Sequence, residues 1–187
     1  MKSTIQQLPF YQFYLRDYTH PKNLSHAIGV IGSTRYCYAF THLYRDTEKF
    51  TINSAVIKYG KGADFEWQKG NWGDRVYRQA GNIPGWDVML TGESGEEMIK
   101  NYIPAYQAKY NRTVHKDDVA VLLWDFSTYK FISEHQWDVC LRQFENFFIE
   151  EHERNFGFRP PGNTKNAVTP GTTVVSDQTF DTLFTTT

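Results

Sequence analysis

The chain has 187 residues, of which 40% are hydrophobic and 17% aromatic, so it is long enough for one domain with a real core and too short for two ordinary ones. No apolar run of about 18 residues occurs and no apolar segment opens the chain, so we expect neither a membrane span nor a secretory signal. We therefore expect a cytoplasmic protein. The formal net charge of −1 excludes a protein held to nucleic acid by bulk charge alone.

Charge is unevenly distributed along this nearly neutral chain. Residues 57–80 carry five basic and three acidic side chains, residues 98–116 carry four basic and no acidic ones, and residues 134–153 carry one basic and six acidic ones. The first two segments are therefore candidates for contact with phosphate, whereas the third would meet phosphate only through a metal ion. The two cysteines, Cys37 and Cys140, lie far apart and in no metal-ligand spacing, which favours reduced core thiols.

Two strands and a short helix are predicted in the first half of the chain. Residues 1–33 are aromatic and irregular and form an N-terminal extension. STRYCYAFTHLY (33–44) and FTINSAVIKY (50–59) are rich in β-branched and aromatic residues and flank a polar turn, so they predict a hairpin. GKGADFEWQKGNWG (60–73) has four glycines and no period, which predicts a loop, and DRVYRQAG (74–81) predicts a helix that Gly81 stops.

The second half is predicted to hold two more helices and the most buried strand. The capping-box signal SGEE (94–97) predicts a helix that Pro104 ends or kinks. VAVLLWDF (119–126) is an unbroken apolar run, which is typical of a central strand buried on both faces. The signal SEHQ (133–136) caps a long helix with an apolar stripe that ends near Asn155.

The C-terminal segment differs in composition from the rest. Residues 164–187 hold nine threonines among 24 residues and almost no charge, which predicts a mobile tail. Its short apolar cluster FDTLF (180–184) is a candidate for docking on a partner or on the domain itself.

The order of these elements resembles the GIY-YIG nuclease superfamily, in the variant with a lysine in the second motif that occurs in some type II restriction enzymes. The matching features are a tyrosine on the first strand, a second strand ending in Lys58-Tyr59-Gly60, a helix with arginine, a buried strand, and a helix with an internal glutamate before PPGN. The resemblance covers residues 34–163. It implies an α+β domain with a small, mainly antiparallel three-stranded sheet flanked by helices.

The resemblance also implies which residues act. Tyr38 would be the first-strand tyrosine, with Tyr36 and Tyr44 as alternatives, and Arg75 the helix arginine, with Arg78 as its competitor. Gln79 stands where the family has a histidine, one turn beyond Arg75. The implied catalytic residues are Tyr38, Lys58, Arg75 and Glu145, with Glu145 as the metal ligand. Tyr59, Lys61, Lys69, Arg78 and Asn163 would contact nucleic acid.

These residue types suit hydrolysis of a DNA phosphodiester bond. Glu145 as a single carboxylate suits Mg²⁺ or Mn²⁺, because Mg²⁺ prefers oxygen ligands and retains water. Arg75 would bind the phosphate oxygens through its planar fork, and Lys58 would favour the phenolate of Tyr38. Trp72 and Trp86 are candidates for stacking on bases, although a tryptophan after Pro-Gly is as often a packing anchor.

Two other interpretations remain open at this point. One is a non-catalytic module that holds nucleic acid or a partner protein on the same fold. The other is an accessory protein of viral or phage origin that acts through its Thr-rich tail. For an endonuclease with one metal site that cuts both strands of DNA, a homodimer is expected.

Overall fold

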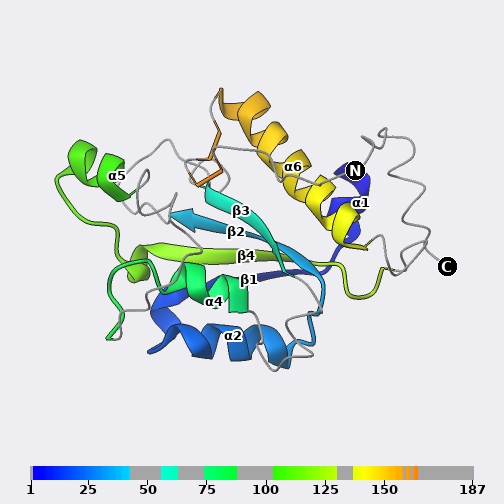
Figure 1. The fold of residues 1–187 in the computed structure, drawn as a ribbon, viewed down its shortest axis with the longest axis horizontal. Helices are drawn as coiled ribbons and strands as arrows, with labels where there is room; N and C mark the ends of the chain where they lie inside the picture. Colours follow the sequence, from blue (N-terminus) through cyan, green and yellow to red (C-terminus); the bar gives the residue numbers. More distant parts are fainter. Residues whose placement is uncertain are drawn as a thin grey trace.

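Four antiparallel strands form one sheet in the computed structural model, which describes residues 2–42, 56–62, 74–87, 103–129, 137–157, 159–160 and 162–163. The strand order is β1-β4-β2-β3, and each neighbouring pair is antiparallel. Helices pack on this sheet, so the expected α+β class is confirmed (Figure 1). The strands are β1 (Phe10–Tyr14), β2 (Tyr36–His42), β3 (Val56–Gly62) and β4 (Val119–Asp125).

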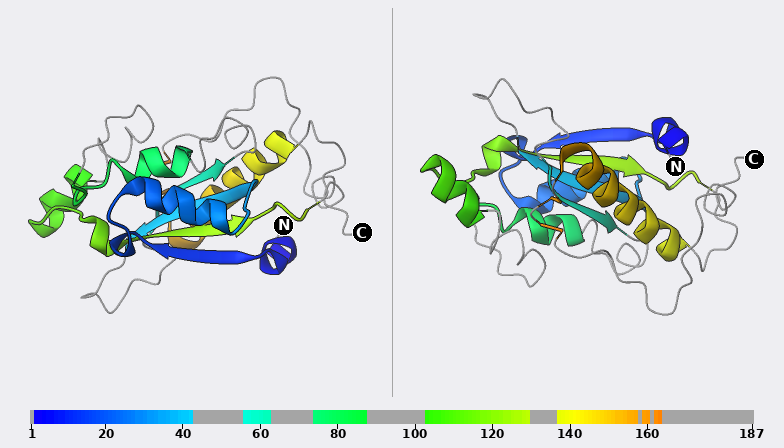
Figure 2. Two further views of the ribbon diagram at one scale, coloured as in Figure 1. Left: turned by 90° about the horizontal axis from the view of Figure 1, so that it is seen from below. Right: turned by 90° about the horizontal axis from the view of Figure 1, so that it is seen from above.

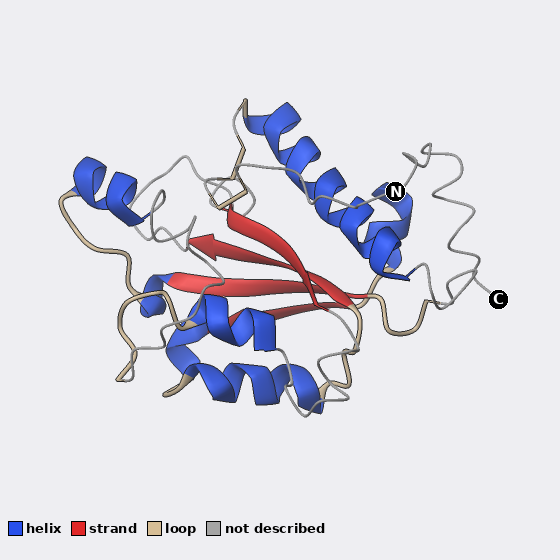
Figure 3. Cartoon of the chain, viewed as in Figure 1, coloured by secondary structure: helices blue, strands red, loops and turns tan. Residues whose placement is uncertain are grey.

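The helices lie on both faces of the sheet. α2 and α4 cover one face and α6 covers the other, as the views from below and above show (Figure 2). The sheet is therefore the middle layer of three (Figure 3). The helices are α1 (Lys2–Gln7), α2 (Pro21–Val30), α4 (Asp74–Ala80), α5 (Ile103–Tyr110) and α6 (Trp137–Phe156), with short 3₁₀ turns η1 (Leu15–Asp17) and η3 (Lys116–Asp118).

The sheet has four strands where three were expected, because the N-terminal extension contributes β1. Phe10 to Tyr14 pair with β4, and the Asp125 N–H donates to the Pro9 carbonyl at 2.9 Å. β4 therefore lies between β1 and β2, as its continuous apolar run predicts. None of the described helices is long and apolar enough to cross a bilayer.

Two predicted boundaries need correction. β3 continues through Gly60, Lys61 and Gly62, which were predicted to begin a loop, because the two glycines fit beneath aromatic rings of β2. Pro104 occupies the first turn of α5, where a missing N–H is harmless, so the helix continues past it to Tyr110, and residues 88–102 lie outside the described part of the chain. The predicted helix start at 94–97 and the Thr-rich tail at 164–187 lie outside the described residues.

Alternation along β2 separates the core into two parts. Tyr36, Tyr38 and Phe40 face α2 and α4 and belong to one buried cluster, whereas Cys37 and Ala39 face α6. All five side chains are almost completely buried. The face on which a β2 or β3 residue lies therefore decides which helix it can act with.

Candidate active site

Two tyrosines of β2 lie directly on two glycines of β3. Tyr38 pairs with Gly60 and Tyr36 with Gly62 in the strand register. A Cβ added to Gly60 would lie only 2.9 Å from Tyr38 Cε2 and closer still to Cζ, and one added to Gly62 would lie 2.6 Å from the Tyr36 hydroxyl. Only glycine leaves room for these rings. The Tyr-x-Tyr and Gly-x-Gly segments have the same spacing because each tyrosine stacks on one glycine across the strands.

The Tyr38 hydroxyl is fixed by α4. It donates a hydrogen bond of 3.0 Å to Gln79 Oε1, and both side chains are almost wholly buried. Gln79 stands one turn after Arg75, whose backbone lies in the first turn of α4 and whose side chain is outside the described residues. Arg78 lies on the same helix and is exposed. The structure thus brings the strand tyrosine, Gly60 of the KYG segment and the arginine-bearing helix together.

Lys58 lies on the same side of the sheet as Tyr38. It is paired with Phe40 and stands two residues before Gly60, so the pleat directs both positions to the face that α4 covers. Its side chain is partly buried, and Gly162 packs so closely on it that a Cβ at position 162 would lie 2.8 Å from Lys58 Cβ. Lys58 is therefore held at the outer edge of the sheet by the PPGN segment.

Asn163 binds the backbone of β3 rather than projecting into solvent. Its Oδ1 accepts from the Tyr59 N–H at 2.6 Å and its Nδ2 donates to the Tyr59 carbonyl at 3.0 Å. The Gly162 N–H donates to the Ile57 carbonyl at 2.8 Å. Asn163 is buried, so its placement supports a structural role in closing the edge of β3 and gives no support to the predicted contact with nucleic acid.

Tyr59 faces α6 and is part of the core. Its ring stacks on Phe148 with centroids 5.3 Å apart and meets His152 edge-on at 6.0 Å. Burial raises the pKa of Tyr59 and lowers that of His152 to about 4, so both side chains are neutral at pH 7. A ring so enclosed offers no face to a base, and the predicted role of Tyr59 in nucleic-acid binding gains no support.

Lys61 also faces α6, where its charge is paired within the protein. It is 5% exposed and forms an ion pair with Asp138, which accepts a second hydrogen bond from Arg142 Nε at 2.8 Å. The predicted role of Lys61 in binding phosphate therefore has no support from its position. Lys69, the remaining predicted contact with nucleic acid, lies outside the described residues, as do Tyr44 and Trp72.

Glu145 lies on α6, across the sheet from Tyr38. Burial is the main cause of the raised pKa of Cys37, the Glu145 charge raises it further, and Lys61 opposes that rise, so Glu145 and Lys61 both lie near this buried thiol. Glu145 itself is partly buried. The structure therefore does not bring Glu145 and Tyr38 onto one face, although the two faces meet at the edge strand β3.

The chemistry of Glu145 is compatible with a single-carboxylate metal site. No group of three or more His, Cys, Asp or Glu side chains gathers among the residues that the structure describes. Mg²⁺ does not require such a group, because it is often bound by one or two carboxylates with waters and substrate phosphates completing its shell. Glu145 is thus a suitable donor for this ion, whereas zinc would need more protein ligands.

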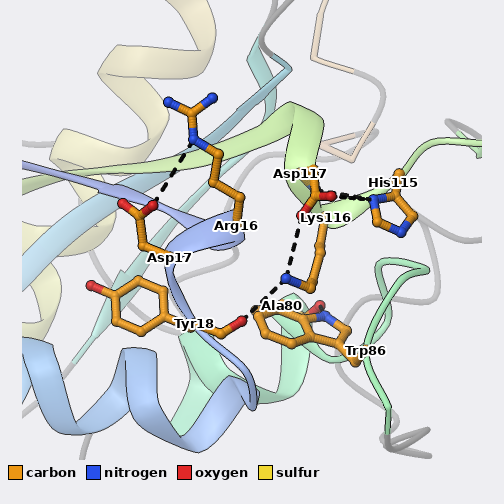
Figure 4. Close-up of polar contacts among 8 residues, drawn as sticks. All are labelled: Arg16, Asp17, Tyr18, Ala80, Trp86, His115, Lys116 and Asp117. Atoms are coloured by element: carbon orange, nitrogen blue, oxygen red, sulfur yellow. Dashed lines mark hydrogen bonds and ion pairs between the residues drawn. The ribbon is translucent and has the colours of Figure 1, made fainter.

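Lys116 and Trp86 form a packing cluster (Figure 4). Lys116 Nζ donates to the Tyr18 carbonyl at 3.1 Å, lies 3.3 Å from Asp117 Oδ1, and stands 5.0 Å from the centre of the Trp86 ring. The Trp86 Nε1–H donates to the Ala80 carbonyl at 2.9 Å. Trp86 is therefore a packing anchor at the end of α4, and Lys116 joins three segments instead of extending a basic surface.

The Asp138 pair predicts a pH dependence of stability. Burial alone would raise the pKa of Asp138, but hydrogen bonds and charge from Lys61 and Arg142 outweigh it and lower the pKa below 3.8. Because the folded pKa is below the unfolded one, the stabilisation is complete above about pH 4 and is lost as pH falls through the folded pKa. Asp138→Asn should therefore lower the free energy of unfolding most at neutral pH and progressively less in acid.

Urea unfolding of wild type and Asp138→Asn between pH 7 and pH 3 measures this difference. Asp87→Asn, at an exposed position, is the matched control and should show a small effect at every pH. A destabilisation by Asp138→Asn that is equally large at both ends of the range would contradict the ion pair.

Comparison with known proteins adds no family to this geometry. No family model, no curated protein and no solved structure matches the chain.

Proposed function

We propose that the chain is a Mg²⁺-dependent endonuclease of the GIY-YIG type that hydrolyses phosphodiester bonds of DNA. The observation that carries this function is the contact of Tyr38 with Gly60 and Gln79. It joins in one place the strand tyrosine, the KYG strand and the helix of Arg75. The order of β2, β3, α4, β4 and α6 along the chain supports the same type, with β1 as an addition to its three-stranded sheet.

Each residue on the α4 face has a separate task. Tyr38 donates its hydroxyl hydrogen to Gln79, which fixes the position of the phenol oxygen, and in this proposal that oxygen orients the attacking water. Lys58, on the same face, would favour negative charge on that oxygen. Arg75 would bind two phosphate oxygens at once and stabilise the charge that develops in the transition state.

Glu145 would hold the metal ion from the α6 side. The ion supplies Lewis-acid stabilisation of the phosphate and of the leaving oxygen. β3 is one of the two outer strands of the sheet, so a DNA backbone crossing its edge can meet groups from both faces. We infer that the substrate would lie along β3 beyond the stretch that Gly162 and Asn163 already cover.

A non-catalytic binding module is the second candidate, and specific observations favour it. Tyr38 is completely buried, and the sheet lies between it and the helix of Glu145. On this view Tyr38 and Gln79 simply anchor α4, while basic side chains such as Arg78 bind nucleic acid.

Cleavage of supercoiled plasmid and of a branched DNA, with Mg²⁺ and with chelator, separates the two candidates. For the nuclease, Mg²⁺-dependent nicking should fall by about 100-fold or more in Glu145→Ala, because one group that stabilises the transition state is worth this much. Glu150→Ala is the matched control, since Glu150 is exposed on the same helix. Binding of both DNAs without cutting would leave the binding module as the function, whereas equal cleavage rates for the two variants would exclude Glu145 as the metal ligand.

A further inference from the structure

The first strand, β1, forms an outer edge of the sheet with an unusual composition. Its sequence is Phe-Tyr-Gln-Phe-Tyr, without charge, proline or bulge. Natural proteins usually protect an outer strand with one of those devices, because its free backbone groups pair readily with another strand. The strand lies at the border of the sheet in both views of Figure 2.

The hydrogen-bond pattern identifies which backbone groups face outward. The Asp125 N–H donates to the Pro9 carbonyl, so the backbone carbonyl of Pro9 points toward β4. By alternation, the backbone N–H and C=O groups of Tyr11 and Phe13 also point toward β4. The N–H groups of Phe10, Gln12 and Tyr14 consequently point away from the sheet, as do the carbonyls of Phe10 and Gln12. Within the described part of the chain these outward groups have no recorded hydrogen-bond partner.

The side chains on this strand are also exposed where a partner would contact them. Phe10 is 50% exposed although its ring lies only 5.4 Å from the ring of Trp124, and Gln12 is exposed beside it. Tyr11 and Phe13 lie on the other face, partly buried against the core. An edge strand with outward backbone groups and a half-exposed phenylalanine is suited to pairing with a further strand.

We propose that β1 pairs with β1 of a second copy of this chain, so that two four-stranded sheets join into one continuous sheet across a twofold axis at Gln12. In an antiparallel pairing centred there, Gln12 exchanges both of its outward backbone bonds with the partner's Gln12. Each Tyr14 N–H then donates to the partner's Phe10 carbonyl. This register uses the outward N–H groups of Gln12 and Tyr14 and both outward carbonyls of each copy.

The sequence of β1 is better suited to pairing with a second β1 than to pairing with an unrelated strand. In the twofold register Phe10 lies opposite the partner's Tyr14, and Tyr11 opposite the partner's Phe13. Every flanking cross-strand pair is therefore aromatic with aromatic, which is favourable, and no like charges meet. The interface does not depend on the proposed nuclease activity, and it would bring two copies of the domain together for a double-strand cut.

Gln12→Pro tests the pairing without disturbing the strand's own ladder. Proline removes an N–H that points away from β4 and blocks close approach of a second strand, and it is tolerated at such positions on edge strands. Gln12→Thr is the matched control, because threonine keeps the N–H and favours strands. By light scattering after gel filtration at micromolar concentrations, wild type and Gln12→Thr should have twice the chain mass of 21.9 kDa, and Gln12→Pro the single mass.

Gln12→Cys is a second, independent test. At the twofold axis the two Cα atoms of such a pair are about 5.5 Å apart, within the disulfide range of about 4.4–6.8 Å, so mild oxidation should give a covalent dimer. Asn23→Cys, exposed on α2, should not cross-link, and the native Cys37 and Cys140 are buried. A monomeric wild type would overturn the proposal, as would a dimer that survives Gln12→Pro together with a Gln12→Cys variant that does not cross-link.

Discussion

Gly60→Ala is expected to destabilise the protein by about 3 kcal/mol, the upper part of the range for inserting a methyl group into a packed site. The new Cβ would lie 2.9 Å or less from three atoms of the Tyr38 side chain, two in the ring and the hydroxyl oxygen. That ring cannot move aside easily, because it is completely buried, packs edge-on against Phe40 at 5.8 Å, and is tied to Gln79. For a chain of this length the midpoint of thermal unfolding should fall by roughly 6–12 °C.

Gly32→Ala is the matched control for this variant. Gly32 has a positive φ of 74° but nothing within 4 Å of an added Cβ, so alanine there costs only the backbone strain of about 1 kcal/mol. Comparing the two variants separates crowding from backbone conformation. If Gly60→Ala were no more harmful than Gly32→Ala, the stacking of Tyr38 on Gly60 would not be an essential contact.

Elements with strong local patterns could be predicted from the sequence. The strand at 119–126 was found at Val119–Asp125, because an unbroken apolar run of that length needs burial on both faces. The helix at 74–81 was found at Asp74–Ala80, because Gly81 is a poor helix former. In both cases the information lies within a few residues of the element.

Features that depend on distant partners could not be predicted. β1 was missed because five nearly all-aromatic residues show no alternation, and their partner strand lies more than a hundred residues away. Gly60 and Gly62 resemble loop residues until the rings above them are known. The charge of Lys61 suggested contact with phosphate, but Asp138, which neutralises it, lies 77 positions away.

The same limit explains the outcome for the candidate site. The spacing of two residues between Tyr36 and Tyr38 equals that between Gly60 and Gly62, and this match was the available signal that the pairs stack. Gln79 was noted only as a departure from the family, whereas in the structure it holds Tyr38. Which face each side chain occupies follows from the strand register, which is a property of the whole sheet.

Arg75→Lys is expected to reduce the rate of DNA cleavage by about 100-fold or more. Lysine keeps the positive charge but lacks the planar fork that binds two phosphate oxygens, so bulk attraction to DNA should persist while the transition state is less stabilised. Position 75 stands one turn before Gln79, whose side chain contacts Tyr38, so the two positions lie on the same side of α4.

Arg78→Lys is the control that decides between the two arginines. Arg78 is exposed on the same helix, and the same exchange there should change the rate by no more than a few-fold. Single-turnover cleavage and DNA binding measured in parallel distinguish a loss in the chemical step, which we expect for Arg75→Lys, from a loss in affinity. A large loss in Arg78→Lys with none in Arg75→Lys would exchange the two roles, because the reacting phosphate would then lie over the exposed side of α4.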